Sequence, residues 1–181
     1  MQSLFLKKRY LISFEAHRLP YIFTDVLVIG SGAAGMRAAI EAAQYGQVIL
    51  VSKAKALETN TYYAQGGLAA VLDDDDSIQA HIADTVSTGA GLGDEEVIRA
   101  VISAAPEHVA QMRSWGVDFD AENGSLSLGR EGGHSANRIV HADGDSTGKA
   151  LATVLARRVA DTANLKLFEE CFVIDLVTDP P

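Results

Sequence analysis

Residues 24–35 read T-D-V-L-V-I-G-S-G-A-A-G, and this stretch decides the fold. Its first half, Thr24 to Ile29, is a short apolar run rich in valine and isoleucine, which predicts a buried strand covered on both faces. The alanine-rich residues 33–45 predict a helix, with Gly46 as its C-terminal cap. Residues 47–51 predict a second buried strand, so the local order is strand, tight turn, helix, strand.

Three glycines in this stretch have separate physical roles. Gly30 makes the turn, Gly32 lets the backbone approach a pyrophosphate, and Gly35 lets the helix pack close to the strand. Phosphate is attracted by the free N–H groups and the positive end of the helix dipole. We therefore predict a Rossmann-like α/β domain that binds a dinucleotide, although a plain loop of small residues would show the same spacing. The residues expected to contact the pyrophosphate are Ser31, Gly32, Ala33 and Ala34.

The end of the second strand departs from the usual fingerprint, which has an acidic residue there for the ribose hydroxyls. This chain has Ser52 and Lys53 instead. A serine hydroxyl can still bond a ribose and a lysine adds positive charge, so we expect both residues beside the nucleoside half of the ligand. An ordinary solvated lysine is the alternative for Lys53.

Length and composition are those of one globular domain. The chain has 181 residues, of which 48% are hydrophobic, and a net charge of −9, which argues against nucleic acid and anionic membranes as partners. No apolar run reaches membrane-spanning length and no signal peptide is visible, so we expect a cytoplasmic protein with no membrane partner. Cys171 is the single cysteine and is expected to be a buried structural thiol, and the five histidines show no metal-ligand spacing.

The remaining sequence predicts further helices and loops. The acidic runs at 73–76 and 94–96 are expected to be a solvated loop and a helix start. Asn123-Gly124 predicts a tight turn, and residues 129–137 form a polar, glycine-rich loop. The other expected elements are an N-terminal extension (1–23) with a strand over 10–14, an irregular segment (54–72) that turns helical from Gly67, helices over 77–87, 95–114 (divided or kinked at Pro106) and 145–163 (capped by D-S-T-G), and a strand over 165–177 with a break near Glu170.

Five motifs in this order resemble the succinate dehydrogenase and fumarate reductase flavoprotein family. They are T-D-V-L-V-I-G-S-G-A-A-G (24–35), V-S-K (51–53), N-T-Y-Y-A-Q-G-G-L-A-A (60–70), R-E-G-G-H-S (130–135) and H-A-D-G-D-S-T-G (141–148). The resemblance covers residues 24–178 and implies an FAD-binding domain with a βαβ unit, a parallel sheet and added helices. It also implies that residues 24–181 are an incomplete, N-terminal part of that domain, without the substrate-capping and C-terminal helical domains.

The N-T-Y-Y-A-Q-G-G run is where the resemblance places the flavin. In family members with covalent FAD, a histidine stands five residues before the glutamine of this motif. Here that position is Asn60, whose amide cannot form the bond, so FAD is expected to be held non-covalently. Gln65 can bond a flavin heteroatom. The residues expected along the ribityl chain and the ring are Asn60, Thr61, Tyr62, Tyr63, Ala64, Gln65, Gly66 and Gly67.

Glu131 is the candidate catalytic residue. Succinate and fumarate enzymes of the family present an aromatic residue before the paired glycines of this loop, whereas the branch that oxidises L-aspartate has a glutamate. Aspartate differs from succinate by one ammonium group, which a carboxylate can bond. The alternatives for Glu131 are a salt bridge with Arg130 or a plain exposed position. Among the histidines, His134 could face the substrate or be structural, His141 is interpreted as structural, and His81 and His108 as surface or interface residues.

The reaction implied by the resemblance is FAD-dependent oxidation of L-aspartate to iminosuccinate. Reduced FAD would be reoxidised by O2, giving hydrogen peroxide, or by fumarate. The resemblance also implies the first step of de novo NAD biosynthesis via quinolinate, with quinolinate synthase receiving the product. The chain by itself is expected to be inactive, because the family's catalytic arginine lies beyond residue 181. The alternatives are a succinate dehydrogenase or fumarate reductase type of flavoprotein and a non-catalytic nucleotide-binding fragment.

Overall fold

The computed structural model describes residues 19–176, and its larger sheet is parallel. The strand order is β1–β2–β8, with β1 at Val26–Ile29, β2 at Val48–Val51 and β8 at Leu165–Phe168. The predicted βαβ unit, its parallel pairing and the α/β class are confirmed. The strand predicted over 10–14 lies outside the described residues.

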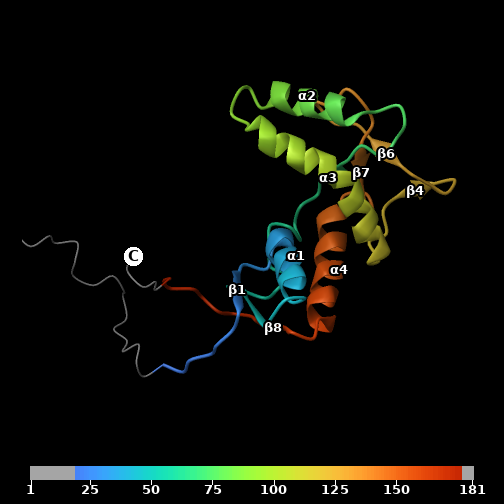
Figure 1. Ribbon diagram of the computed structural model, residues 1–181. Coiled ribbons are helices and arrows are strands. Elements are labelled where there is room, and N and C mark those ends of the chain that lie inside the picture. Colours follow the sequence, from blue (N-terminus) through green and yellow to red (C-terminus); the bar gives the residue numbers. More distant parts are fainter. Residues whose placement is uncertain (1–18, 177–181) are drawn as a thin grey trace, which may run out of the picture.

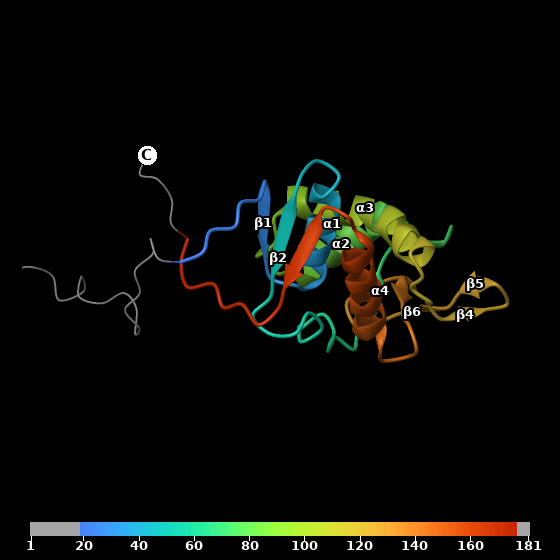
Figure 2. The same cartoon turned by 90° about the horizontal axis from the view of Figure 1, so that it is seen from below.

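Two helices, α1 (Ala33–Ala42) and α4 (Thr147–Asp161), pack side by side against one face of this sheet (Figures 1 and 2). Apolar side chains from all three elements fill the interface, among them Met36, Leu50 and Leu155. The C-terminal cap of α1 is Ala43 and not the predicted Gly46. Gly46 is required for packing instead, since a Cβ there would lie 2.7 Å from the Asp25 carboxylate.

The opposite face of β1 is open. Leu27 is 51% exposed and Ile29 is 49% exposed, while the alternate residues Val26 and Val28 pack against the core. The prediction that this strand is covered on both faces is therefore wrong for the described part of the chain.

A second, antiparallel sheet joins segments that are distant in the sequence. Its order is β3 (Leu68–Ala69), β7 (Ile139–Val140) and β6 (Leu128–Gly129). Helices α2 (Ile78–Thr88) and α3 (Glu95–Ser114) pack against each other near this sheet (Figure 1). A hairpin of β4 (Ala121–Glu122) and β5 (Ser125–Leu126) turns at Asn123 and Gly124, whose φ angles of +52° and +87° confirm the predicted tight turn.

Several predicted details differ in the structure. The helix expected from Gly67 is a strand, β3, because this segment pairs with β7. One helix, α3, runs through Pro106 without division, and Asp94 caps it as predicted by accepting hydrogen bonds from the N–H groups of Glu96 and Val97.

At the start of α4, the predicted D-S-T-G cap has a different role. Ser146 occupies the N-cap without a side-chain hydrogen bond, and Thr147 accepts one from the backbone N–H of Ala142, which fixes the preceding turn. The break expected near Glu170 is present, since β8 ends at Phe168 and Glu170 has φ +56°. Cys171 follows it in irregular backbone and is partly exposed, so it is not the buried thiol that we predicted.

Candidate functional site

The glycine fingerprint forms the predicted turn between β1 and α1. Gly30 has φ +105°, a left-handed conformation that glycine adopts without strain. A Cβ at Gly35 would overlap the carbonyl oxygen of Gly30, so the helix can approach the strand this closely only with glycine at position 35. Gly32 caps α1 without any side-chain hydrogen bond, which leaves the start of the helix uncovered by a cap side chain.

A cavity of about 310 Å³ lies beside this turn. It brings together five of the predicted cofactor residues, namely Ser31, Gly32, Lys53, Asn60 and Thr61. Ser52 also lines it, but its hydroxyl is buried and hydrogen-bonded to the Ser31 hydroxyl at 2.8 Å. Ser52 therefore joins the two loops. Its hydroxyl is not free to bond a ribose, so that prediction is wrong.

The Asn60–Ala64 segment is held against the N-termini of two helices. Thr61 Oγ1 accepts a hydrogen bond from Ala33 N at the start of α1, at 3.0 Å. Ala64 O accepts one from Gly148 N at the start of α4, at 3.1 Å. A Cβ at Gly148 would overlap the carbonyl oxygen of Thr61, so the contact is close.

These features fit a dinucleotide pyrophosphate. The cavity opens at the start of α1, where the helix dipole favours negative charge, and Thr61 is the side chain hydrogen-bonded to the turn there. At Gly30 no atom lies within 4 Å of where a Cβ would be, so there is room for a ligand beside the backbone. The exposed Lys53 adds a positive charge at the cavity wall.

The remaining residues of this run have unequal surroundings. Ala64, Gln65 and Gly66 are exposed, and a Cβ at Gly66 would meet nothing within 4 Å. Tyr62 packs partly buried against the core, and its ring meets that of Tyr63 edge-on at 5.3 Å. Tyr63 donates its hydroxyl hydrogen to Glu58 at 2.9 Å, and this hydrogen bond raises the pKa of Tyr63. Gln65 and Gly66 are thus solvent-exposed. Tyr62 contacts the core and Tyr63 contacts Glu58, so both tyrosines already contact other protein groups.

Glu131 lies in the loop between β6 and β7, and its side chain is 60% exposed. Its neighbour is His141, with 3.8 Å between Glu131 Oε1 and His141 Nε2. The alternative that Glu131 forms a salt bridge with Arg130 is therefore not what the structure shows. His141 directly follows β7, where Val140 pairs with Leu68 of β3. The antiparallel pairing therefore brings the Glu131 loop next to Gly67 at the end of the A-Q-G-G motif.

A buried ion cluster supports the same loop, and it was not predicted. Arg138 is fully buried, donates two hydrogen bonds to the Asp76 carboxylate at 2.8 Å each, and donates a third to Asp84 at 2.7 Å. Asp84 also accepts hydrogen bonds from the backbone N–H and the hydroxyl of Ser135, at 2.8 and 2.7 Å. The side chain of Asp76 is 2% exposed, so the interpretation of the 73–76 run as wholly solvated is wrong for this residue.

The cluster perturbs the ionisation of its members. Burial alone would raise the pKa of Asp76, but the hydrogen bonds from Arg138 and Ser77 lower it. The two hydrogen bonds from Ser135 lower the pKa of Asp84 to about 2, with Arg138 adding to the effect. His81 is buried against this cluster, with its ring 5.6 Å from that of His134, and burial lowers the pKa of His81. His81 was predicted to be a surface or interface residue, and its burial within the chain contradicts this.

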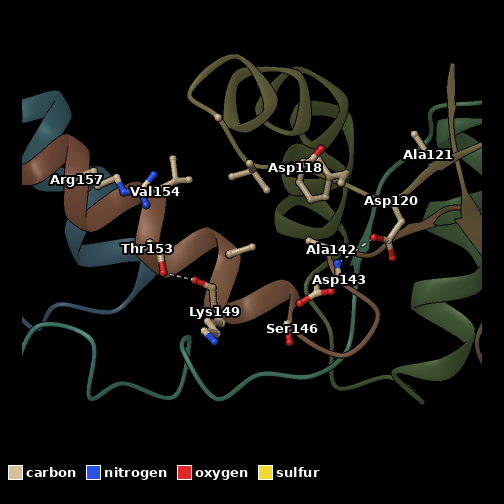
Figure 3. Close-up of a pocket in the computed structure, with 14 residues that line it drawn as sticks. Asp118, Asp120, Ala121, Ala142, Asp143, Ser146, Lys149, Thr153, Val154 and Arg157 are labelled. Carbon is tan, nitrogen blue, oxygen red and sulfur yellow. Dashed lines mark hydrogen bonds between the residues drawn. The ribbon is translucent and has the colours of Figure 1, made fainter.

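Another cavity lies away from the glycine fingerprint. It measures about 660 Å³ and is lined by residues 116–121, the turn around Asp143 and one side of α4 (Figure 3). Asp120 accepts hydrogen bonds from the backbone N–H groups of Asp143 and Gly144 and so closes one wall. None of the residues predicted for the cofactor or the substrate lines it.

Among the described residues, no helix is both long and apolar enough to cross a membrane.

Comparison with known proteins agrees with the geometry of the fingerprint. A family model described as FAD binding domain matches residues 25–180. The chain is 47% identical to the chloroplastic L-aspartate oxidase of Oryza sativa subsp. japonica over 157 residues, which are 86% of this chain and 24% of that protein. It is 46% identical to the L-aspartate oxidase of Vibrio cholerae, again over 86% of this chain and over 30% of the relative.

Solved structures give the same fold. The E. coli quinol fumarate reductase matches with a TM-score of 0.83 and 33% identity, over 86% of this chain and 27% of that one. The chain therefore spans roughly a quarter to a third of the length of the relatives it matches, and the similarity concerns their cofactor-binding part.

Proposed function

The chain belongs to the FAD binding domain family, and from this premise we propose that it is the cofactor-binding part of an FAD-dependent oxidoreductase that oxidises L-aspartate to iminosuccinate. The proposed acceptor is O2, which yields hydrogen peroxide, or fumarate. The product would enter de novo NAD biosynthesis through quinolinate, with quinolinate synthase as the receiving enzyme. A cytoplasmic location remains a prediction, since the rice relative is named chloroplastic.

The observation that carries the proposal is the position of Glu131. Its carboxylate is exposed, and it approaches His141, which follows the strand paired with β3 next to Gly67. An ammonium group on the substrate would find a charge-assisted partner in this carboxylate, whereas succinate has no group to place there. A buried ion cluster at Arg138 fixes the loop that carries Glu131, so the carboxylate has a defined place.

The residues proposed to hold FAD are those of the fingerprint and the 60–67 run. The backbone N–H groups of residues 31–34 would receive the pyrophosphate, with Lys53 beside the adenosine half. Asn60 cannot form a covalent bond to the flavin, so the cofactor would be held by contacts alone. When bound, FAD supplies the two-electron acceptor for the oxidation. The protein groups orient the substrate, and Glu131 holds its ammonium.

The test uses the full reading frame that contains this chain. Purified enzyme is assayed for peroxide with L-aspartate and, separately, with succinate under O2, and for succinate formation from fumarate. Turnover of L-aspartate with little or no turnover of succinate supports the proposal. Turnover of succinate alone contradicts it and removes Glu131 from ammonium recognition.

The second candidate is a succinate dehydrogenase or fumarate reductase type of flavoprotein. The match to E. coli quinol fumarate reductase favours it, while Asn60 and Glu131 oppose it. A flavin that stays with the protein pellet after acid precipitation would be covalently attached and would favour this second candidate, whereas a released flavin fits both. A third candidate is a nucleotide-binding protein without catalysis. A reading frame that encodes no arginine-bearing substrate domain after these residues would favour that one.

A further inference from the structure

His141 occupies a position that links the two parts of the site. It follows β7 directly, and the pairing of Val140 with Leu68 sets it opposite Gly67. A Cβ at Gly67 would lie 3.0 Å from His141 Nε2, and a Cβ at Gly129 would lie 3.0 Å from Cε1 of the same ring. The imidazole is thus packed between two glycines, one in the A-Q-G-G motif and one at the base of the Glu131 loop.

The same ring nitrogen faces Glu131. The separation of 3.8 Å from Glu131 Oε1 is within ion-pair range and longer than a hydrogen bond. The imidazole therefore lies close to the carboxylate without using its hydrogen-bonding capacity. A carboxylate can accept several hydrogen bonds at once, so both oxygens can still accept from a ligand. His141 is 26% exposed and Glu131 is 60% exposed, so a ligand can reach the carboxylate while the ring stays packed.

We infer that His141 is a positioning residue for the ammonium-binding carboxylate and that its Nε2 side keeps Glu131 near Gly67. This inference rests on the proposed function, because it assumes that Glu131 receives the ammonium of an amino dicarboxylate substrate. Nε2 faces the Glu131 carboxylate from the part of the ring that lies against Gly67, so one imidazole contacts both the A-Q-G-G motif and the candidate ammonium-binding group.

The experiment compares three variants in the full-length protein. His141→Phe keeps a ring in the space between the glycines but has no N–H, His141→Gln keeps a donor, and His108→Phe changes an exposed histidine on α3 as the matched control. Loss of one polar contact to a charged group corresponds to about a tenfold effect at most, so H141F is expected to raise KM for L-aspartate by up to about tenfold while kcat changes by less than about twofold. H141Q and H108F should stay close to the wild type.

Two further measurements separate positioning from general damage. Ligand binding is followed by the visible absorbance of bound FAD, which needs no turnover. H141F should weaken L-aspartate and leave succinate unchanged, and equal weakening of both, or of neither, overturns the inference. In a double-mutant cycle, H141F should add no further loss in a Glu131→Gln background, because His141 acts through Glu131.

The failures of the two proposals are distinguishable. A wild type that binds L-aspartate without oxidising it contradicts the proposed function, while the absorbance titration of H141F still decides the role of His141. A normal L-aspartate oxidation rate with an unchanged KM in H141F contradicts only the inference about His141. Should H141F fail to retain FAD, His141→Ala replaces it in the absorbance titration and in the cycle with Glu131→Gln, and full additivity of a loss in His141→Ala with that of Glu131→Gln overturns the inference.

Discussion

Gly66 and Gly67 are adjacent in the A-Q-G-G motif, but the structure places different demands on them. A Cβ at Gly67 would overlap the side chain of Ile139 and the carbonyl oxygen of Val140 on β7, whereas a Cβ at Gly66 would meet nothing. The pairing of β3 with β7 therefore requires glycine at 67, and Gly66 is left with open space that a bound ligand can use.

This difference predicts opposite outcomes for two alanine variants. Gly67→Ala should lower the free energy of unfolding by about 1–3 kcal/mol, since overpacking against backbone cannot relax easily. Gly66→Ala should leave the stability of the ligand-free chain nearly unchanged and reduce FAD affinity. Guanidinium unfolding and a fluorescence titration with FAD measure the two quantities. Equal stability of the two variants would contradict the close packing of Gly67 on β7.

Glu131→Gln tests the substrate end of the site. The amide keeps the size of the side chain and loses its charge, so the full-length variant should lose roughly 10- to 100-fold in kcat/KM for L-aspartate, in line with one hydrogen bond between charged groups. Binding of succinate should change little. Glu122→Gln, an exposed carboxylate on the β4–β5 hairpin, is the matched control. Equal losses for both ligands would remove Glu131 from ammonium recognition.

At the scale of elements, α2 and the turn before it bind the Glu131 loop through buried ion pairs. Asp76 and Asp84 both bind Arg138, which precedes β7. Breaking a buried pair leaves an uncompensated charge, so Asp76→Asn should cost about 3 kcal/mol or more of the free energy of unfolding. Asp74→Asn, an exposed neighbour, should stay within about 0.5 kcal/mol. Unfolding curves of the two variants check this, and indistinguishable curves would mean that the Asp76–Arg138 pair does not hold the fold.

Asp84 predicts a pH dependence of stability. Its pKa is lowered in the folded state from 3.8 to about 2, so its contribution is fully present above the unfolded value and is lost as the pH falls toward about 2. Wild type should therefore exceed Asp84→Asn in stability at about pH 5, and the gap should narrow at about pH 3. Denaturation midpoints at both pH values measure it. A gap that is constant with pH would show that Asp84 acts by shape alone.

The elements that the sequence predicted are those with a local signal. The fingerprint, the Asp94 cap of α3 and the Asn123-Gly124 turn depend on neighbouring residues, and the structure has all three. The two-residue strand β3 has no periodicity to detect, since its partner lies about 70 residues later in β7. Arg138 was missed for the same reason: its carboxylates come from 54 and 62 residues earlier. An arginine directly before the apolar Ile139 and Val140 was the available signal.

In the candidate site, too, the sequence predicted residues that belong to local motifs and missed contacts between residues distant in the sequence. Two of the predicted cofactor residues in the fingerprint, Ser31 and Gly32, line one cavity with Asn60 and Thr61, and their role in cofactor binding stays a prediction. The surroundings of Glu131 could not be read from the chain, because its neighbour His141 is ten residues away across a loop closed by the β6–β7 pairing. His141 was interpreted as structural because no local pattern connects it to Gly67.

On the scale of the whole molecule, the parallel sheet is asymmetric. Helices α1 and α4 cover one face (Figure 2). Leu27 and Ile29, on the other face of β1, are about half exposed. Among the described residues, β1 pairs with β2 alone, so it is also an edge strand. An apolar edge with unpaired backbone groups is a surface on which chains associate.

The 181-residue chain should therefore self-associate through this surface, and a charge placed on it should reduce the association. Leu27→Lys points a lysine to the open face and should lower the apparent mass in light scattering at a given concentration, with little change in unfolding temperature. Val28→Lys is the matched control, because Val28 packs against the core beside Gly35, and a lysine there should unfold the chain. If Leu27→Lys destabilised the chain as much as Val28→Lys does, the second face of the sheet would be covered in solution. Association that persisted in Leu27→Lys with unchanged stability would assign it to another surface.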